Sequence, residues 1–306
     1  MVNSPSDKTI VLHLLRGAVP ERADEISGLW KQHGHEVEVA PNARGSTMNA
    51  TSKRIRFDTK TVDFFWLIGF SAWRAIEVYA PALTLATATG LTLEAALNID
   101  EERALFEQEY KHRFACSKSL LSVSDASEVD WPDDVPQPTN KRDSLDSNEQ
   151  KLVYDLILLG LAFAFLHEFK HVQARVLKSD QEKPEEEMAC DTWARDFMTT
   201  GLAEYAKKNG HSYAEVEQKR AMGIVLAAVT IHAMTPHNAY WGSDEYPPIG
   251  ERLIAMIDGY NLPFDSPFWV FTGCLLVALM RQDNRKLEYT ASSSKDFVLV
   301  LLGELR

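Results

Sequence analysis

The first sixty residues alternate apolar and polar positions in short runs, a pattern that predicts strands joined by turns. Residues 36–40 (EVEVA) and 53–58 (KRIRFD) alternate charged and apolar side chains, and residues 9–15 (TIVLHLL) form a short apolar run. Residues 20–33 favour a helix, because a proline suits its first turn and a glycine follows its end. We therefore expect a small mixed sheet with strands at 9–15 and 36–40, an exposed or edge strand at 53–58 and a polar turn at 42–52.

The rest of the chain changes to helical spacing. Residues 61–79 repeat aromatic and aliphatic side chains every three or four positions. Residues 91–116 gather charges, Arg103 and Glu107 among them, on a side that we expect to be a solvated face. Residues 122–150 are rich in serine, aspartate, proline and asparagine and predict a linker or a lid. We expect further helices at 151–166, 185–200, 213–234, 249–257 and 268–280, and a strand or a helix at 297–305.

These patterns predict an α+β protein that is mostly helical. We expect one compact domain in four segments: a small mixed sheet region at 1–60 packed on the core, a helical region at 61–121, a loop or lid at 122–150 and a helical core at 151–306. The chain has 306 residues, of which 45% are hydrophobic, so it is long enough and apolar enough to bury a sizeable core.

The charge and the apolar runs of the chain limit the classes of partner that we expect. The formal net charge is −12 and no basic run occurs, which argues against nucleic acid as a partner. The first residues lack a basic start followed by an apolar core, so we expect no secretory signal. The apolar runs 152–166, 221–234 and 268–280 are shorter than a spanning helix, so we expect buried helices and no membrane span.

The cysteines indicate a reducing compartment. Cys116, Cys190 and Cys274 are an odd number, widely spaced, with no C-x-x-C pair. We therefore expect a cytoplasmic protein without a disulfide framework, in which Cys190 is a buried, inert thiol.

The five residues His167-Glu168-Phe169-Lys170-His171 have the pattern H-E-x-x-H. Histidines four apart lie on one face of a helix, where both imidazoles can hold one metal ion, and Glu168 can reach a water on that ion. The apolar segment before the motif favours burial, and buried polar groups need a partner. The alternative interpretation is a helix that merely carries two surface histidines.

The next predicted helix supplies the rest of a metal site. Glu187 and Asp191 are four apart and share a face. A catalytic zinc ion takes three protein ligands and keeps one position for water, and a zinc-bound imidazole usually donates its other N–H to a carboxylate. We therefore predict zinc as the cofactor, Glu187 as the third ligand and Asp191 as the acceptor for His167 or His171. Glu186 is the rival ligand, and the alternative is that these acidic residues only cap a helix.

The pairing of H-E-x-x-H with E-x-x-x-D on the next helix resembles the gluzincin metallopeptidases. The resemblance implies a zincin-like core with His167, His171 and Glu187 on zinc, Glu168 as the general base and Asp191 behind a histidine. The segment Tyr246-Pro-Pro-Ile-Gly-Glu-Arg-Leu253, with the form of both motifs and the overall size, looks like the Lit-type phage-exclusion peptidases. Those are bacterial cytoplasmic proteins that cut a translation elongation factor when a phage peptide is present.

A peptidase also needs a group that stabilises the oxyanion of the transition state. The candidates for this role and for further catalytic roles lie in one segment: His232, His237, Tyr240, Tyr246 and Arg252. Each has an alternative, since His232 sits on an apolar helix, Tyr240 can be packing and Arg252 can be a structural ion-pair partner. In related zincins a histidine often stands before the proline where this chain has Tyr246.

The sequence therefore predicts a zinc-dependent endopeptidase that cleaves a protein or peptide substrate, with the elongation factor and phage exclusion as the narrower expectation. The strand at 53–58 is a candidate for binding an extended substrate by strand addition. An unregulated cytosolic peptidase would be harmful, so an activating peptide or protein is a further expected partner. The alternatives are a non-catalytic zincin-like metal-binding module that regulates or interacts, and a helical protein without metal.

Overall fold

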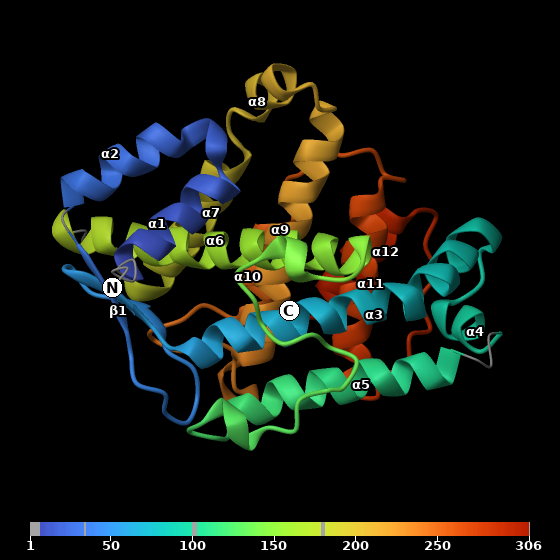
Figure 1. The fold of residues 1–306 in the computed structure, drawn as a ribbon. Helices are drawn as coiled ribbons and strands as arrows, with labels where there is room; N and C mark the ends of the chain where they lie inside the picture. Colours follow the sequence, from blue (N-terminus) through green and yellow to red (C-terminus); the bar gives the residue numbers. More distant parts are fainter. Residues whose placement is uncertain (1–6, 34, 100–102, 179–180, 306) are drawn as a thin grey trace.

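The computed structural model describes residues 7–33, 35–99, 103–178 and 181–305. A long helix, α6 (Asn148–Val176), runs through the centre of the molecule, and α3 (Thr59–Thr89), α7 (Lys183–Thr199) and α9 (Tyr213–Met234) pack directly against it (Figure 1). The other α-helices are α1 (Asp7–Ala18), α2 (Ala23–His33), α4 (Leu93–Leu97), α5 (Arg103–Leu120), α8 (Leu202–Asn209), α10 (Ile249–Ile257), α11 (Pro267–Gln282) and α12 (Ser294–Gly303). The mostly helical α+β class is confirmed.

Two glycines let the neighbouring helices approach α6 closely. A Cβ atom on Gly69 of α3 would lie 2.4 Å from Cγ1 of Ile157, and one on Gly223 of α9 would lie 2.4 Å from Cβ of Leu159. No real side chain tolerates such contacts, so at these two positions the side chains of Ile157 and Leu159 on α6 pack directly on the backbones of α3 and α9. This packing explains why the apolar segment of α6 is buried.

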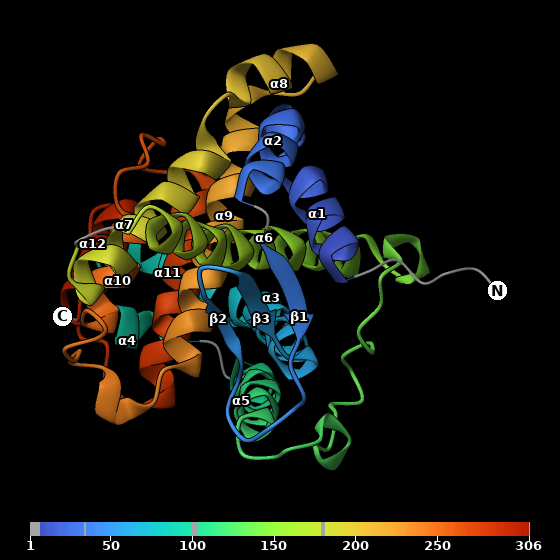
Figure 2. The ribbon, with the colours of Figure 1, turned by 90° about the vertical axis from the view of Figure 1, so that its left-hand side faces the viewer.

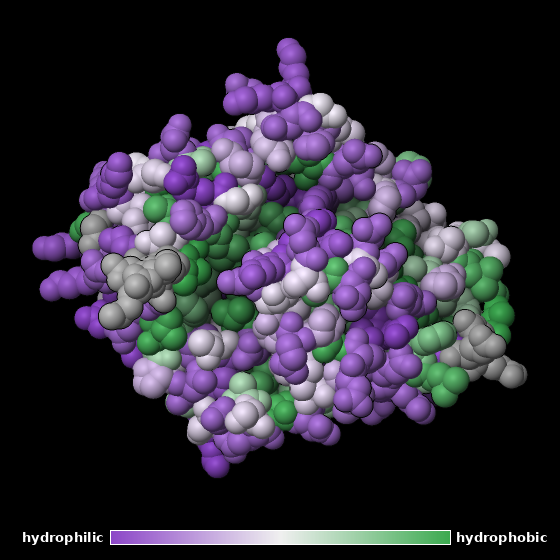
Figure 3. Space-filling model, viewed as in Figure 1, coloured by the Kyte–Doolittle hydropathy of each residue, from purple (hydrophilic) through white to green (hydrophobic). Residues whose placement is uncertain are grey.

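The helix α6 is longer than the apolar run 152–166 that the sequence predicts. It has 29 residues and is the one described helix that is long and apolar enough to cross a membrane. However, 83% of its apolar window is buried inside the protein, as in the core helix of a soluble fold. Figure 3 shows that the face of the molecule seen in Figure 1 is largely hydrophilic, with apolar residues at the right-hand end near α4 and in an area left of centre.

The small mixed sheet is confirmed, and it consists of β1 (Glu36–Val39), β2 (Met48–Ala50) and β3 (Arg54–Phe57). The strand order is β1-β3-β2, with β1 parallel and β2 antiparallel to β3. Both β2 and β3 contact α6, and Figure 2 shows the sheet beneath α6, with α1 and α2 on the other side of that helix. The sheet therefore lies against the helix that carries the H-E-x-x-H motif.

Two predictions about the N-terminal segment are wrong. Residues 9–15 belong to α1, in which Val11, Leu15 and Ala18 are buried and Ile10 is 52% exposed. That burial follows the helical repeat rather than alternation, so the apolar run is the buried face of a helix and part of its flanks. The predicted turn at 42–52 contains β2, a strand of three residues that is too short to show a pattern.

The prediction that 53–58 is an edge strand is also wrong, because β3 is the central strand. Ile55 and Phe57 of β3 are buried. The arginines that alternate with them point the other way, and Arg54 and Arg56 both pair with Glu38 on the neighbouring β1. Cross-strand pairing of opposite charges thus allows a charged strand to occupy the middle of the sheet, and β2 is an edge strand instead.

The predicted solvated face of 91–116 is wrong for two of its charges. The segment divides into α4 and α5, and Arg103 and Glu107 of α5 are 9% and 6% exposed. Glu107 forms ion pairs with Arg103, Lys111 and Arg281. Burial is tolerated because each charge has a partner of opposite sign.

The segment 122–150 forms two short 3₁₀ turns and an irregular loop before α6 begins. It packs on α3 and α5, where Trp66 Nε1 donates to the carbonyl of Pro136 (2.7 Å) and Arg113 pairs with Asp134 (2.6 Å). None of its residues lines the cavity described below. In this structure the segment is therefore a packed connection that lies away from the cavity, and its movement as a lid stays a prediction.

The remaining helix predictions are confirmed. Residues 20–33 form a short 3₁₀ turn followed by α2, and α3, α6, α7, α9, α10 and α11 occupy the expected segments. The undecided segment 297–305 is mainly the helix α12, and α8 is an additional helix that was not predicted.

Candidate active site

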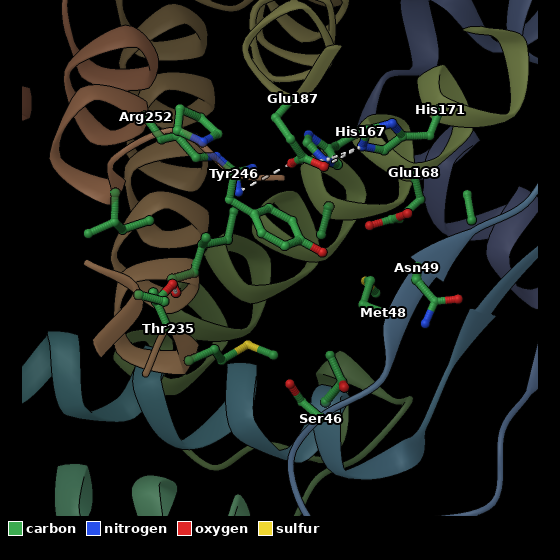
Figure 4. Close-up of a pocket in the computed structure, with 18 of the residues that line it drawn as sticks. Ser46, Met48, Asn49, His167, Glu168, His171, Glu187, Thr235, Tyr246 and Arg252 are labelled. Carbon is green, nitrogen blue, oxygen red and sulfur yellow. Dashed lines mark hydrogen bonds and ion pairs between the residues drawn. The ribbon is translucent and has the colours of Figure 1, made fainter. Parts of the chain in front are cut away.

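The H-E-x-x-H motif lies in the second half of α6 and faces α7. His167, Glu168 and His171 are 6%, 8% and 5% exposed, so the helix carries all three into the interior as the sequence predicts. The neighbouring α7 starts with a proline in its first turn and brings its own acidic residues against the same face. Figure 4 shows the histidines and Glu187 converging on one point at the edge of a cavity.

Three predicted ligands meet within the reach of a single ion. Nε2 of His171 lies 3.1 Å from Nε2 of His167 and 3.1 Å from Oε1 of Glu187. Nε2 of His167 lies 3.4 Å from Oε2 of Glu187. Donor atoms held at about 2.0–2.2 Å from a tetrahedral zinc ion are about 3.4 Å apart. Two imidazoles and one carboxylate at these distances therefore fit a zinc ion.

The second nitrogen of each imidazole faces a carboxylate. Nδ1 of His167 lies 2.8 Å from Oδ1 of Asp191, so the structure selects His167 of the two predicted partners. Nδ1 of His171 lies 2.5 Å from Oε1 of Glu186. Glu186 thus contacts the nitrogen of His171 that faces away from Glu187, a contact that sequence reasoning missed. Sγ of Cys190 also lies 3.5 Å from this Nδ1, and burial raises the pKa of its thiol.

Arg252 of α10 binds the carboxylates of Asp191 and Glu187. Its Nε and Nη2 donate to the two oxygens of Asp191 at 2.7 Å and 2.9 Å, and its Nη1 lies 3.4 Å from Oε2 of Glu187. Asp191 is fully buried and Arg252 is 8% exposed. Such two-pronged pairs are geometrically specific. Arg252 therefore fixes the positions of a predicted ligand and of the group behind His167.

A cavity of about 510 Å³ opens beside these groups. Its polar wall contains His167, Glu168 and Glu187, and Figure 4 shows the carboxylate of Glu168 directed into it. The edge strand β2 forms another wall, and the floor is apolar; the lining includes Met48, Asn49, Ala50, Phe65, Ala164, Ile231 and Met234. The arrangement offers a base, a set of metal donors and room for part of a polypeptide.

The comparisons with known proteins agree with this arrangement. The family model described as peptidase U49 matches residues 55–272, which is more than half of the chain and includes every predicted ligand. The chain belongs to the peptidase U49 family. Searches of curated proteins and of solved structures found no match.

Tyr246 lies at the edge of the cavity. Figure 4 shows its ring between Arg252 and Glu168 with the hydroxyl directed into the open space. Burial raises the pKa of this hydroxyl, with the nearby acidic groups acting in the same direction. The phenol therefore keeps its proton and is a hydrogen-bond donor at the cavity.

The other candidates are not brought into the cavity in the same way. His232 is a buried histidine of α9 whose ring packs on Tyr240, with centroids 4.7 Å apart, and neither residue lines the cavity. Burial lowers the pKa of His232 to about 4, with Lys118 acting in the same direction. His237 is exposed outside the cavity. Arg252 lines the cavity, but its guanidinium is engaged by Asp191.

The charges of the site depend on one another. Burial alone would lower the pKa of His167, but Asp191 and Glu187 raise it to about 10. Burial would raise the pKa of Glu187, but hydrogen bonds to the two histidines and the charge of Arg252 hold it below its usual range. Burial also raises the pKa of Glu168, against the two histidines. The carboxylates of the cluster therefore stabilise positive charge placed among them, as the carboxylates of a metal site do.

Proposed function

We propose that this peptidase is a zinc-dependent endopeptidase with a gluzincin-like, zincin-type core. The observation that carries the proposal is the convergence of His167, His171 and Glu187 within 3.1–3.4 Å of one another. The side that these donors leave open is the cavity, which is where a catalytic site keeps a position for water or substrate. Zinc in this position would supply a Lewis acid and lower the pKa of a water molecule bound beside it.

The side chains around this position have separate roles in the proposed reaction. Glu168 accepts a proton from the attacking water and delivers it to the nitrogen of the leaving amine. The hydroxyl of Tyr246 donates a hydrogen bond to the carbonyl oxygen as it gains negative charge. Asp191 and Glu186 hold the imidazoles of His167 and His171 in orientation.

The substrate is proposed to be an extended segment of a protein. β2 has β3 on one side only, and its residues Met48, Asn49 and Ala50 line the cavity. A polypeptide that adds to this edge would place its carbonyl groups near Glu168. The strand-addition proposal therefore moves from β3, where the sequence suggested it, to β2.

The resemblance to the Lit-type peptidases supports a narrower role. We propose that the enzyme acts in a bacterial cytoplasm, cleaves a translation elongation factor and serves phage exclusion, with an activating peptide or protein as a partner. The free and buried cysteines, Cys116, Cys190 and Cys274, support a reducing compartment.

The test compares wild type with Glu168→Gln. Wild type is expected to contain one equivalent of zinc and to cut a translation elongation factor in the presence of phage lysate, and a chelator is expected to abolish cutting. Glu168→Gln is expected to keep the zinc and lose about 10²–10⁴-fold in rate. Glu149→Gln, an exposed glutamate on the same helix, is the matched control.

Two results would change the proposal. Cleavage by Glu168→Gln at the wild-type rate would remove Glu168 as the base. Bound zinc without cleavage of any protein would favour the non-catalytic metal-binding module, and protein purified with no metal and no affinity for it would favour the metal-free alternative.

A further inference from the structure

A second, shallower groove adjoins the active-site cavity on the far side of Tyr246. Its volume is about 450 Å³, and Tyr246 and Pro247 line both spaces. The first turns of α7 form one side of the groove and the segment 241–251 forms the other; the lining includes Pro184, Glu185, Met188, Trp241, Pro248 and Glu251. A peptide that lies in the active site can therefore reach this groove by passing one side chain.

Trp241 lines this groove, and most of its large side chain is exposed to solvent. Its side chain is 74% exposed, and Tyr246 beside it is 51% exposed. Exposed aromatic residues that gather beside a site are typical of binding surfaces, where tryptophan and tyrosine supply much of the affinity.

A fixed turn holds Trp241 in this position. The backbone N–H of Gly242 donates to Ala239 (3.1 Å), and that of Ser243 donates to Tyr246 (2.8 Å). Gly242 has a φ of +82°, and a Cβ there would lie 2.9 Å from the nitrogen of Pro248. Only glycine fits such a position. The display of Trp241 is therefore part of the fold and not the result of a loose loop.

The charges of the groove are negative and uncompensated. Glu185 and Glu251 are both exposed, and neither has an ion pair among the residues that the structure describes. The nearby cations are engaged, because Lys183 pairs with Glu245, and Arg252 pairs with Asp191 and Glu187. A positively charged ligand would therefore meet two carboxylates that are free to pair with it.

We propose that this groove is a specificity subsite for a lysine or arginine side chain of the substrate, at one fixed position close to the cleaved bond. The aliphatic stem of such a side chain packs on Met188 and the prolines. Its cationic head lies over the face of Trp241 and near the carboxylates of Glu185 and Glu251. The inference rests on the proposed endopeptidase function and adds a substrate preference to it.

An uncharged apolar side chain fits the groove less well. It would contact the same apolar atoms, but it would displace water from two carboxylates without offering them a hydrogen-bond donor or a positive charge. The negative charge thus distinguishes a basic side chain from an apolar one of equal size.

The first experiment measures binding and does not depend on turnover. Two peptides are compared, acetyl-Ala-Ala-Arg-Ala-Ala-amide and the same peptide with citrulline, which has the shape of arginine without its charge. The protein is Glu168→Gln with zinc, and the signal is the fluorescence that Trp241→Phe removes. The arginine peptide is expected to bind about fivefold to tenfold more tightly, and the difference is expected to shrink in high salt.

Paired variants locate the effect. In Glu185→Gln/Glu251→Gln the ratio of the two affinities is expected to fall close to one. The matched control, Glu204→Gln/Glu288→Gln, removes the same charge from exposed positions outside the groove and is expected to keep the ratio. Equal affinities of the two peptides for the parent protein, or a ratio unchanged in the groove variant, would overturn the proposal.

The second experiment measures cleavage. Wild type is incubated with a library of peptides from a whole-proteome digest, and the residues around each cut are counted. Lysine and arginine are expected to be enriched at one position within about three residues of the cut, and the groove variant is expected to lose that enrichment. Cutting without any basic enrichment would overturn the subsite while leaving the endopeptidase intact, whereas no zinc-dependent cutting combined with a clear arginine preference in binding would overturn the catalysis alone.

Discussion

At the scale of single residues, Arg252 is the side chain on which the metal donors depend most. It donates to both oxygens of Asp191, which is fully buried, and lies 3.4 Å from Glu187. A buried carboxylate that loses the cation bound to both of its oxygens is costly, at about 3–5 kcal/mol. The residue therefore supports both the stability of the fold and the geometry of the ligands.

The corresponding prediction compares Arg252→Met with Arg252→Lys. The methionine variant is expected to lose about 3 kcal/mol of stability without metal and to bind zinc about 10–100-fold more weakly. Lysine keeps the charge but not the planar fork, so an intermediate affinity is expected. Urea unfolding of the metal-free protein and chelator competition measure the two effects, and wild-type zinc affinity in both variants would contradict the role.

A second residue-scale prediction concerns His35 and acid stability. His35 is fully buried against Trp30, with centroids 4.2 Å apart, and neither ring nitrogen has a hydrogen-bond partner. Burial lowers its pKa to about 4, with Lys8 and His33 acting in the same direction. The unfolded chain, with a histidine pKa of about 6.5, binds more protons than the folded one in this range. Stability is therefore full above pH 6.5 and falls as the pH drops towards 4, by up to about 3 kcal/mol.

His35→Phe tests the sign of this effect. The variant removes the buried imidazole and keeps an aromatic ring, so the loss of stability between pH 7 and pH 5 is expected to be smaller than in wild type. Urea midpoints at several pH values measure it. His13→Phe, a substitution at an exposed histidine of α1, is expected to leave the wild-type pH dependence in place.

Much of the candidate site was predictable because helical spacing translates directly into geometry. His167 and His171 share a face of α6, and Glu187 and Asp191 share a face of α7. The single assumption that these two helices pack against each other therefore brings all four side chains together. The contact of Glu186 with His171 was not predictable, because it depends on how α7 is rotated against α6. The choice of Tyr246 over Tyr240 depends on the turn at Gly242, which sequence spacing does not encode.

At the scale of elements, the position of α6 depends on close contacts with α3 and α9. Gly223 of α9 leaves no room for a side chain against Leu159, whereas Gly28 of α2 has nothing within 4 Å of its Cβ position. The same substitution is therefore expected to have opposite effects at these two helical glycines. Gly223→Ala overpacks the core, while Gly28→Ala removes backbone freedom from the unfolded chain.

We expect Gly223→Ala to destabilise the protein by about 1–3 kcal/mol and Gly28→Ala to stabilise it by about 0.5–1 kcal/mol. Denaturant unfolding of both variants measures the free energies. An equal gain in stability for the two would show that α9 can move away from α6 without cost.

The elements that could not be predicted share a physical cause. In α1 the apolar residues are dense enough to satisfy a strand or a helix, and only packing against α6 decides between them. In β3 the charges suggested exposure, yet Glu38 of β1 neutralises them from the neighbouring strand. In both cases the deciding partner is distant in sequence or belongs to another element.

At the scale of the whole molecule, the candidate site joins three helices from separate parts of the chain. The proposed ligands come from α6 and α7, and the arginine that pairs with Asp191 comes from α10. Four carboxylates, Glu168, Glu186, Glu187 and Asp191, meet there with few positive charges to oppose them. An ion that binds only the folded arrangement adds its binding free energy to the stability of the fold.

Zinc is therefore expected to stabilise the protein as a whole and not only its activity. At a free zinc concentration about 100 times the dissociation constant, the gain is about 2.7 kcal/mol, which raises the melting temperature of a chain of this size by about 4 °C. Thermal unfolding with zinc and with a chelator measures the difference. Glu187→Gln keeps the shape of the ligand and removes its charge, so its shift is expected to be much smaller. A melting temperature of wild type that does not respond to zinc or to the chelator would show that these three side chains do not hold a metal, whatever the enzyme cleaves.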